Sequence, residues 1–260
     1  MANHAPDFTN KTVIVTGGVK GVGRGISERF LEQGANVVVC GRSEPEDLPT
    51  AAGRTAVFKA CDVRDWDQVQ ALMQFAKDTF GSLDVLINNA GGAPFADAAT
   101  VSPRFSEKII SLNLLAPLYC CQAANAIMQE QENGGTIVNI ASVSALRPSP
   151  GTAAYGAAKA GLVNLTTSLA VEWAPKVRLN AIAAGLIKTE QAHLHYGDEA
   201  GIAAVSATIP LNRMANPSDI GDVCLFLGSD LSSYVSGACL TVHGGGEKPA
   251  FLTAGNSDNK

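Results

Sequence analysis

The chain has 260 residues, of which 46% are hydrophobic and 17% are charged, and its formal net charge is −5. This length is sufficient for one large domain with a buried core, and the composition excludes an intrinsically disordered protein. The nineteen basic residues are scattered along the chain, so no nucleic-acid-binding or membrane-binding surface is predicted.

The N-terminal residues, the apolar stretches and the cysteine pattern bear on the cellular environment that we expect. The opening residues, MANHAPDFTNK, contain no apolar signal core, and no stretch reaches the roughly 18 unbroken apolar residues of a membrane span. The six cysteines lie mostly within apolar segments, without a C-x-x-C pair or histidines at metal-ligand spacing. We therefore expect buried free thiols, a cytosolic protein and no metal site.

Short segments rich in β-branched residues alternate with longer helical patterns along the chain. The predicted strands are 12–17, 36–41, 55–60, 83–89, 135–142, 177–184 and 238–242. The predicted helices are 23–33, 65–80, 105–131 with a break at Pro117, and 153–173. Continuous apolar strands that alternate with helices are typical of a parallel sheet covered on both faces, and right-handed connections make this a doubly wound, Rossmann-like α/β fold.

Ligands of such sheets bind at the carboxyl ends of the strands. The first strand is followed by TGGVKGVGRGI, in which Gly17, Gly21 and Gly23 have the spacing T-G-x-x-x-G-x-G. Glycines permit a tight turn and close backbone approach, and the N terminus of the following helix attracts a pyrophosphate. A plain strand-to-helix turn is the alternative, but the position before the first helix favours cofactor binding.

The segment GTAAYGAAKA places Tyr155 and Lys159 four residues apart in an alanine-rich helix. Residues at this spacing lie on the same helix face. A nearby cation lowers the pKa of a phenol from its usual value near ~10, which suits general acid–base catalysis. A solvated pair on a helix surface would have the same spacing, so the pair needs support from other motifs.

That support comes from three further patterns. N-N-A-G occupies 88–91, Ser142 stands thirteen residues before Tyr155, and Asn113 lies in a helix between them. Together with the glycine pattern and Y-x-x-x-K, these motifs stand in an order in which the chain resembles the short-chain dehydrogenase/reductase family over nearly its full length.

The resemblance implies an oxidoreductase that interconverts a carbonyl and a secondary alcohol by hydride transfer. Tyr155 would donate or accept the proton, and Lys159 would bind the nicotinamide ribose and lower the pKa of the phenol. Ser142 would bind the substrate oxygen, with Ser144 as the alternative serine. Asn113 would hold a water that relays protons, unless it only caps or kinks its helix.

The resemblance also implies a cleft for a nicotinamide cofactor. Asp62 would meet the adenine, Thr189 the carboxamide, and Ile187 would pack near the nicotinamide ring. The full predicted set is Gly17, Lys20, Gly21, Val22, Gly23, Arg42, Asp62, Val63, Asn89, Ala90, Gly91, Tyr155, Lys159, Ile187 and Thr189.

Two positions depart from the family pattern. Ala184 stands before Gly185 where the family usually has proline, which predicts a looser turn and less secure positions for Ile187 and Thr189. His243 stands where an aspartate is common, and the sequence offers no mechanism for this change.

The residues after the second strand bear on the choice of cofactor. An acidic residue there would bind the ribose hydroxyls of NAD, but this chain has Arg42, and Lys20 lies in the glycine turn. Two cations and no carboxylate favour NADP(H), with NAD(H) possible. Alternatively, Arg42 stacks on the adenine or is solvated, because acidic residues follow at 44, 46 and 47.

In relatives, the region 191–216 is a mobile lid over the substrate. We expect a single domain, 1–260, with a lid-like segment at about 190–216 and a polar tail at about 247–260. His193, His195 and Tyr196 are candidate substrate contacts or surface residues. Apolar lid residues, with Phe95 and Leu146, favour a moderately apolar substrate. They do not separate a 3-oxoacyl thioester, a steroid, a small ketone or a sugar.

The expected partners are a small-molecule carbonyl or alcohol substrate and further copies of the chain in a homotetramer or homodimer, with no nucleic acid and no membrane. Two other functions stay open. One is an NAD-dependent alcohol or dihydrodiol dehydrogenase on the same fold, and the other is a non-catalytic NADP-binding sensor.

Overall fold

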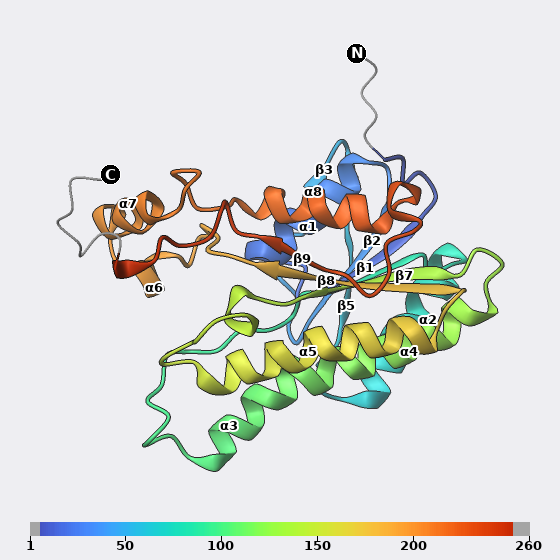
Figure 1. Ribbon diagram of the computed structural model, residues 1–260. Coiled ribbons are helices and arrows are strands. Elements are labelled where there is room, and N and C mark those ends of the chain that lie inside the picture. The colour runs from blue at the N-terminus through green and yellow to red at the C-terminus, as the bar shows by residue number, and fades with distance from the viewer. Residues whose placement is uncertain (1–5, 252–260) are drawn as a thin grey trace.

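A seven-stranded parallel sheet forms the centre of the molecule (Figure 1). The computed structural model describes residues 6–251, apart from the side chain of His195. The strand order is β5-β2-β1-β6-β7-β8-β9, which confirms the predicted doubly wound fold. The strands are β1 Thr12–Thr16, β2 Asn36–Gly41, β5 Val57–Ala60, β6 Val85–Asn88, β7 Gly135–Ile140, β8 Val177–Ala184 and β9 Cys239–Val242. A small hairpin, β3 Thr50–Ala51 with β4 Arg54–Thr55, lies between β2 and β5.

Helices cover both faces of the sheet (Figure 1). One face carries α2 Trp66–Phe80, α4 Ala116–Glu130 and α5 Ala153–Glu172, and the other carries α1 Gly21–Glu32 and α8 Pro217–Gly228. In β1, Val13 and Val15 pack with α1 and α8, whereas Ile14 packs on the opposite face. Because successive strand side chains alternate between faces, both faces must be apolar here, which explains the unbroken apolar strands of the sequence.

Residues 103–130 form one continuous helical stretch, so the predicted break at Pro117 is wrong. α3 Pro103–Ile110 runs through a π-helical turn, η1 Ser111–Leu115, into α4. The N–H of Ala116 donates to the carbonyl of Ser111, five residues back, and Pro117 follows in the first turn of α4. The wider turn shifts the hydrogen-bond register, and proline is tolerated in a first helical turn. By length and composition these 28 residues resemble a membrane span, but 44% of their most apolar window is buried inside the protein.

Three of the remaining elements, η2 Val143–Ala145, α6 His193–Tyr196 and α7 Glu199–Thr208, lie near the carboxyl ends of the strands. The fourth, η3 Asp230–Ser232, lies near the amino end of β8, where Arg178 donates to the carbonyl of Ser229. α8 is absent from the predicted helices, although its start has clear signals. Asn216 forms a capping box with Asp219, and Pro217 occupies the first turn.

Candidate active site

The glycine turn after β1 forms a cradle of exposed backbone. Gly17 and Gly21 have positive φ angles of 63° and 54°, which favour glycine. At Gly23, a Cβ would lie 2.2 Å from the carbonyl oxygen of Gly17 and 2.5 Å from Nδ2 of Asn89, so no larger residue fits. The spacing read from the sequence therefore has a steric cause. Val22 lies in the first turn of α1, beside the same backbone.

The motif after β6 holds this cradle in place. Asn89 donates from Nδ2 to the carbonyls of Thr16, at 2.9 Å, and Gly17, at 3.3 Å. The hydroxyl of Thr16 accepts from the main-chain N–H groups of Asn89 and Ala90, each at 3.0 Å. The side chain of Asn89 is thus committed to the turn, and the two segments form one rigid edge of the cleft.

Ser142, Tyr155 and Lys159 come together between β7 and α5. The Ser142 hydroxyl is hydrogen-bonded to the Tyr155 phenol and also accepts from the main-chain N–H of Ser144, at 3.1 Å. Lys159 is only 3% exposed, and its Nζ donates to the carbonyl of Ile140 at 2.8 Å. Of the two serines considered, Ser142 is therefore the one whose side chain meets the tyrosine.

The electrostatics of the pair differ from the expected lowering of the phenol's pKa. Burial raises the pKa of Tyr155 above its usual value, and the hydrogen bond from Ser142 opposes this rise. Burial lowers the pKa of Lys159 to about 8. The Lys159 ammonium lies 5.6 Å from the centroid of the Tyr155 ring and points to the Ile140 carbonyl. In this state desolvation outweighs the attraction between phenolate and ammonium.

Asn113 lies in the π-helical turn, directly below the N-N-A-G segment. Its Oδ1 accepts from the N–H of Gly92 at 2.8 Å, and its Nδ2 donates to the carbonyls of Gly92, at 2.9 Å, and Ile109, at 3.0 Å. A Cβ on Gly91 would lie 2.7 Å from Asn113 Oδ1 and 3.2 Å from Lys159 Nζ. The structure thus places Gly91 against both Asn113 and Lys159.

The predicted adenine end lies beyond β2 and β5. Asp62 accepts two hydrogen bonds from the Arg64 guanidinium, at 2.9 and 2.6 Å, which lower the pKa of its carboxyl. Arg42 and Lys20 are exposed, and Val63 is buried. Arg42 forms no ion pair with any residue between 6 and 251.

The segment after β8 returns to the glycine cradle. Main-chain hydrogen bonds hold it, from Gly185 to Val242 and between this segment and Ala215. Thr189 approaches Gly21, where a Cβ would lie 3.7 Å from its methyl group, and Ile187 packs on the apolar cluster beside α1 and α8. The predicted looser turn stays a prediction, because these bonds do not report motion.

Glu190 is a residue that the sequence analysis did not single out. Its Oε1 accepts from the N–H of Gly21, at 3.1 Å, at the first residue of α1. A carboxylate therefore lies at the helix end that favours anions. The T-E pair at 189–190 is too common a sequence to have revealed this contact.

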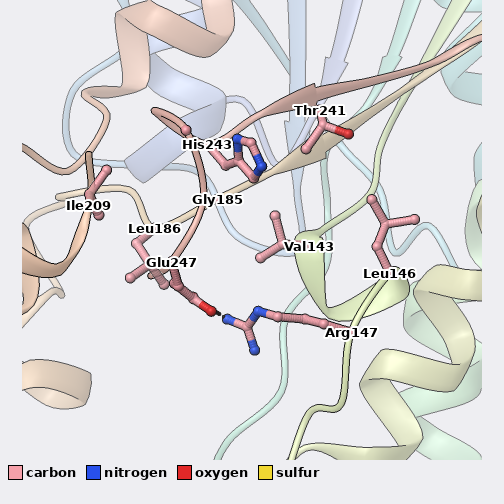
Figure 2. Close-up of a pocket in the computed structure, with 11 residues that line it drawn as sticks. Val143, Leu146, Arg147, Gly185, Leu186, Ile209, Thr241, His243 and Glu247 are labelled. Carbon is pink, nitrogen blue, oxygen red and sulfur yellow. Dashed lines mark hydrogen bonds and ion pairs between the residues drawn. The ribbon is translucent and has the colours of Figure 1, made fainter. Parts of the chain in front are cut away.

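A pocket of about 420 Å³ opens beside the carboxyl ends of β7, β8 and β9 (Figure 2). Val143, which follows Ser142, lines one side, and Ile209 at the end of α7 contributes from the predicted lid. Tyr155 is not among its lining residues and instead lines a separate, smaller pocket of about 120 Å³. The lining residues are Val143, Leu146, Arg147, Gly185, Leu186, Ile209, Thr241, His243, Gly245, Gly246 and Glu247.

The predicted substrate contacts fall in different places. Leu146 lines the pocket, whereas Phe95 does not and is 79% exposed. His193 is exposed and its ring contacts the carbonyl of Glu190, while the side chain of His195 lies outside the described structure. Tyr196 is half-buried, and its pKa is raised chiefly by burial, with Arg147 opposing and Glu247 reinforcing the rise. Much of the predicted tail, residues 252–260, also lies outside the described residues.

His243, one of the two departures from the family pattern, lies against Gly185. A Cβ on Gly185 would lie 2.7 Å from the Cβ of His243, so the ends of β8 and β9 pack closely here. The His243 ring then projects toward the pocket (Figure 2). His243 therefore forms part of the pocket lining.

Comparisons with known proteins show which proteins the chain is similar to. A family model described as enoyl-(acyl carrier protein) reductase matches residues 17–247. A 3alpha-hydroxysteroid dehydrogenase of Mediterraneibacter gnavus is 37% identical over 244 residues, covering 90% of this chain and 96% of that protein. L-rhamnose 1-dehydrogenase (NAD(P)(+)) of Azotobacter vinelandii is 36% identical over 246 residues, covering 91% and 96%. The ligand-free structure of Thermoplasma acidophilum aldohexose dehydrogenase has a TM-score of 0.84 at 32% identity, covering 91% of this chain and 94% of that one.

These matches span nearly the whole chain and include both sequence and fold. The chain therefore belongs to the short-chain dehydrogenase/reductase family of oxidoreductases, which act on CH–OH groups with NAD(P).

Proposed function

We propose that this enzyme interconverts a carbonyl and a secondary alcohol with NADP(H), using Tyr155 as the proton donor and acceptor. The observation that carries the proposal is the contact of Ser142 with the Tyr155 phenol, with the buried ammonium of Lys159 under the same ring. A buried cation beside a half-buried phenol, neither of them in an ion pair with residues 6–251, is arranged for proton exchange.

Each side chain has a distinct task in the proposed reaction. The nicotinamide cofactor, when bound, supplies or accepts the hydride. In reduction, Tyr155 gives its phenolic proton to the substrate oxygen, and in oxidation it takes the proton of the alcohol. Ser142 donates a hydrogen bond to the oxygen as negative charge develops there. Lys159, whose pKa is about 8, is cationic at neutral pH and favours the phenolate that Tyr155 becomes.

Asn113 is proposed as a positioning residue. Both of its side-chain N–H groups are used by Gly92 and Ile109, so a water bound for proton relay would have to use other atoms, such as its main-chain carbonyl. Its contacts keep Gly91 against the Lys159 ammonium. The water relay itself stays a prediction.

The cleft fits a dinucleotide. The glycine turn offers bare backbone at the N terminus of α1, and a carboxylate already accepts from the Gly21 N–H, as a pyrophosphate oxygen would. We propose that Gly17, Gly21, Val22 and Gly23 hold the pyrophosphate. The remaining proposed contacts are Asp62 and Val63 for the adenine, Asn89, Ala90 and Gly91 along the cleft wall, Tyr155 and Lys159 at the ribose, and Ile187 and Thr189 at the nicotinamide.

We propose a preference for NADP(H) over NAD(H) on the charges around Arg42. Arg42 and Lys20 are exposed cations, and no carboxylate pairs with Arg42 among residues 6–251. Asp47, one of the nearby acidic residues, pairs with Arg24 at 2.7 Å and so weakens the positive field less than its position in the sequence suggests. A 2′-phosphate suits a free guanidinium well.

The test is the consumption of NADPH against 3-oxoacyl thioesters, ketosteroids, quinones and sugars, with Tyr155→Phe as the matched variant. We expect a loss of roughly 10²–10⁴-fold in kcat, the range for removal of a general acid. Unchanged turnover in Tyr155→Phe would contradict the proposed role. Faster oxidation of alcohols with NAD⁺ than reduction with NADPH would favour the alternative dehydrogenase, and cofactor binding without any turnover would favour the sensor.

The wider setting is also part of the proposal. We propose one domain over 1–260 whose α6 and α7 form the lid, and a homotetramer or homodimer, as relatives form. A cytosolic location is supported by six free cysteines, of which all but Cys239 are buried.

A further inference from the structure

An ion pair joins two of the residues that line the pocket described above. Nη2 of Arg147, in the loop after η2, donates to Oε1 of Glu247, in the segment after β9, at 2.6 Å (Figure 2). The two residues are 100 positions apart in the chain. Their side chains are 39% and 38% exposed, and such half-exposed pairs contribute little to folding stability. Either side chain can therefore leave the ion pair and bind another partner without disturbing the fold.

The pocket has one cation and one carboxylate. Arg147 and Glu247 are the only Lys, Arg, Asp or Glu side chains among the eleven lining residues. Val143, Leu146, Leu186 and Ile209 give the pocket an apolar part, and Thr241 and His243 lie on one side of it (Figure 2). Its volume of about 420 Å³ lies within the range of small-molecule sites, about 300–1,000 Å³. An apolar molecule with one anionic end would match this lining.

The pocket lies between the proposed catalytic residues and the lid. Val143 directly follows Ser142, so the pocket begins beside the proposed position of the reacting oxygen. Arg147 and Glu247 face each other across the pocket lining, and the charges of both act on the pKa of Tyr196 in α6. The ion pair therefore lies on the side of the pocket that is next to the lid.

We propose that Arg147 binds a carboxylate at the end of the substrate remote from the reacting carbon. In the free enzyme, the Glu247 carboxylate pairs with the Arg147 guanidinium in place of the substrate carboxylate. The inference rests on the proposed function and names its substrate class, a carbonyl compound or secondary alcohol with an apolar body and a terminal carboxylate. On binding, the substrate carboxylate replaces Glu247 on the guanidinium, and Glu247 turns to solvent. The planar guanidinium forms two parallel hydrogen bonds with a carboxylate, which a lysine cannot reproduce.

The experiment uses 5-oxo-5-phenylpentanoate and its methyl ester, which differ only at the end remote from the ketone, where the ester has no charge and carries one more methyl group. For Arg147→Gln, we expect the ratio of kcat/KM for the acid to kcat/KM for the ester to fall roughly tenfold to a hundredfold, with Arg147→Lys intermediate. Glu247→Gln should raise the same ratio, because the competing carboxylate is gone. Glu199→Gln is the matched control. It removes the exposed Lys188–Glu199 pair of the lid region, which does not line the pocket, and should leave the ratio unchanged.

A second measurement is independent of turnover. Calorimetric titration with 5-phenylpentanoate, which has no ketone, should show tighter binding to Glu247→Gln and weaker binding to Arg147→Gln than to the parent enzyme. Equal losses for acid and ester, or no binding of 5-phenylpentanoate to Glu247→Gln, would overturn the inference. If both ketones were inert while the binding series held, the carboxylate site would stand, and the proposed reaction would fail only if the NADPH panel were also inert.

Discussion

Replacing Lys159 by methionine tests the burial of its ammonium directly. The side chain is 3% exposed and its pKa is lowered from 10.5 to about 8 because burial disfavours the charged form. Methionine keeps the apolar stem and removes the charge. The hydrogen bond to the Ile140 carbonyl is also lost, but that loss does not itself titrate.

The sign and size of the change in the free energy of unfolding follow from the coupling between protonation and folding. Because the folded-state pKa is lower than the unfolded one, the unfolded chain binds more protons between the two values. Below about pH 8 the folded parent enzyme therefore bears the full free-energy cost of burying the Lys159 ammonium. This cost disappears as the pH rises through 10.5. A shift of 10.5 − 8, about 2.5 units, corresponds to a penalty of about 3 kcal/mol. From about pH 7 to about pH 9.5, roughly 2 kcal/mol of it disappears.

Urea unfolding of the parent enzyme and Lys159→Met at these two pH values is the assay. We expect the free energy of unfolding of the variant, relative to the parent, to fall by about 2 kcal/mol as the pH rises. Lys176→Met is the control, because Lys176 also donates to a main-chain carbonyl but is exposed. A difference between the parent and Lys159→Met that is the same at both pH values would refute the argument that burial strains this ammonium.

Three further predictions concern the cofactor cleft. Arg42→Ala should weaken NADPH binding roughly tenfold to a hundredfold and NADH binding far less, by fluorescence titration, with exposed Arg54→Ala as control; equal losses for both cofactors would contradict the proposed preference. Glu190→Gln should tighten cofactor binding about two- to fivefold, since it removes an anion from the α1 N terminus, and weaker binding would mean that the carboxylate assists the cofactor. Gly91→Ala should abolish turnover while the circular dichroism spectrum is retained, because its Cβ would lie 2.7 Å from Asn113 Oδ1; full activity would show that this contact can relax.

The local chemistry of the cleft was readable from the sequence. The apolar strands, the T-G-x-x-x-G-x-G turn and the Ser142, Asn113, Tyr155 and Lys159 spacing predicted the fold and the positions that come together. These patterns are informative because strand alternation, glycine sterics and helical i, i+4 spacing act over a few residues. Pro117 misled the prediction, since the π-helical turn that absorbs it has no comparable signature.

The tertiary structure determined the shifted pKa values and the contacts between residues that are far apart in the sequence. The raised pKa of Tyr155 and the lowered pKa of Lys159 depend on how completely the surrounding protein excludes water, which spacing along a helix does not report. Glu190 meets Gly21 across 169 positions, and Arg147 meets Glu247 across 100. The sequence by itself determined the fold class and the family, because both are carried by local motifs and strand patterns. The lining of the pocket was decided only by the folded chain, because it is assembled from loops after three different strands whose ends the sheet brings to one edge.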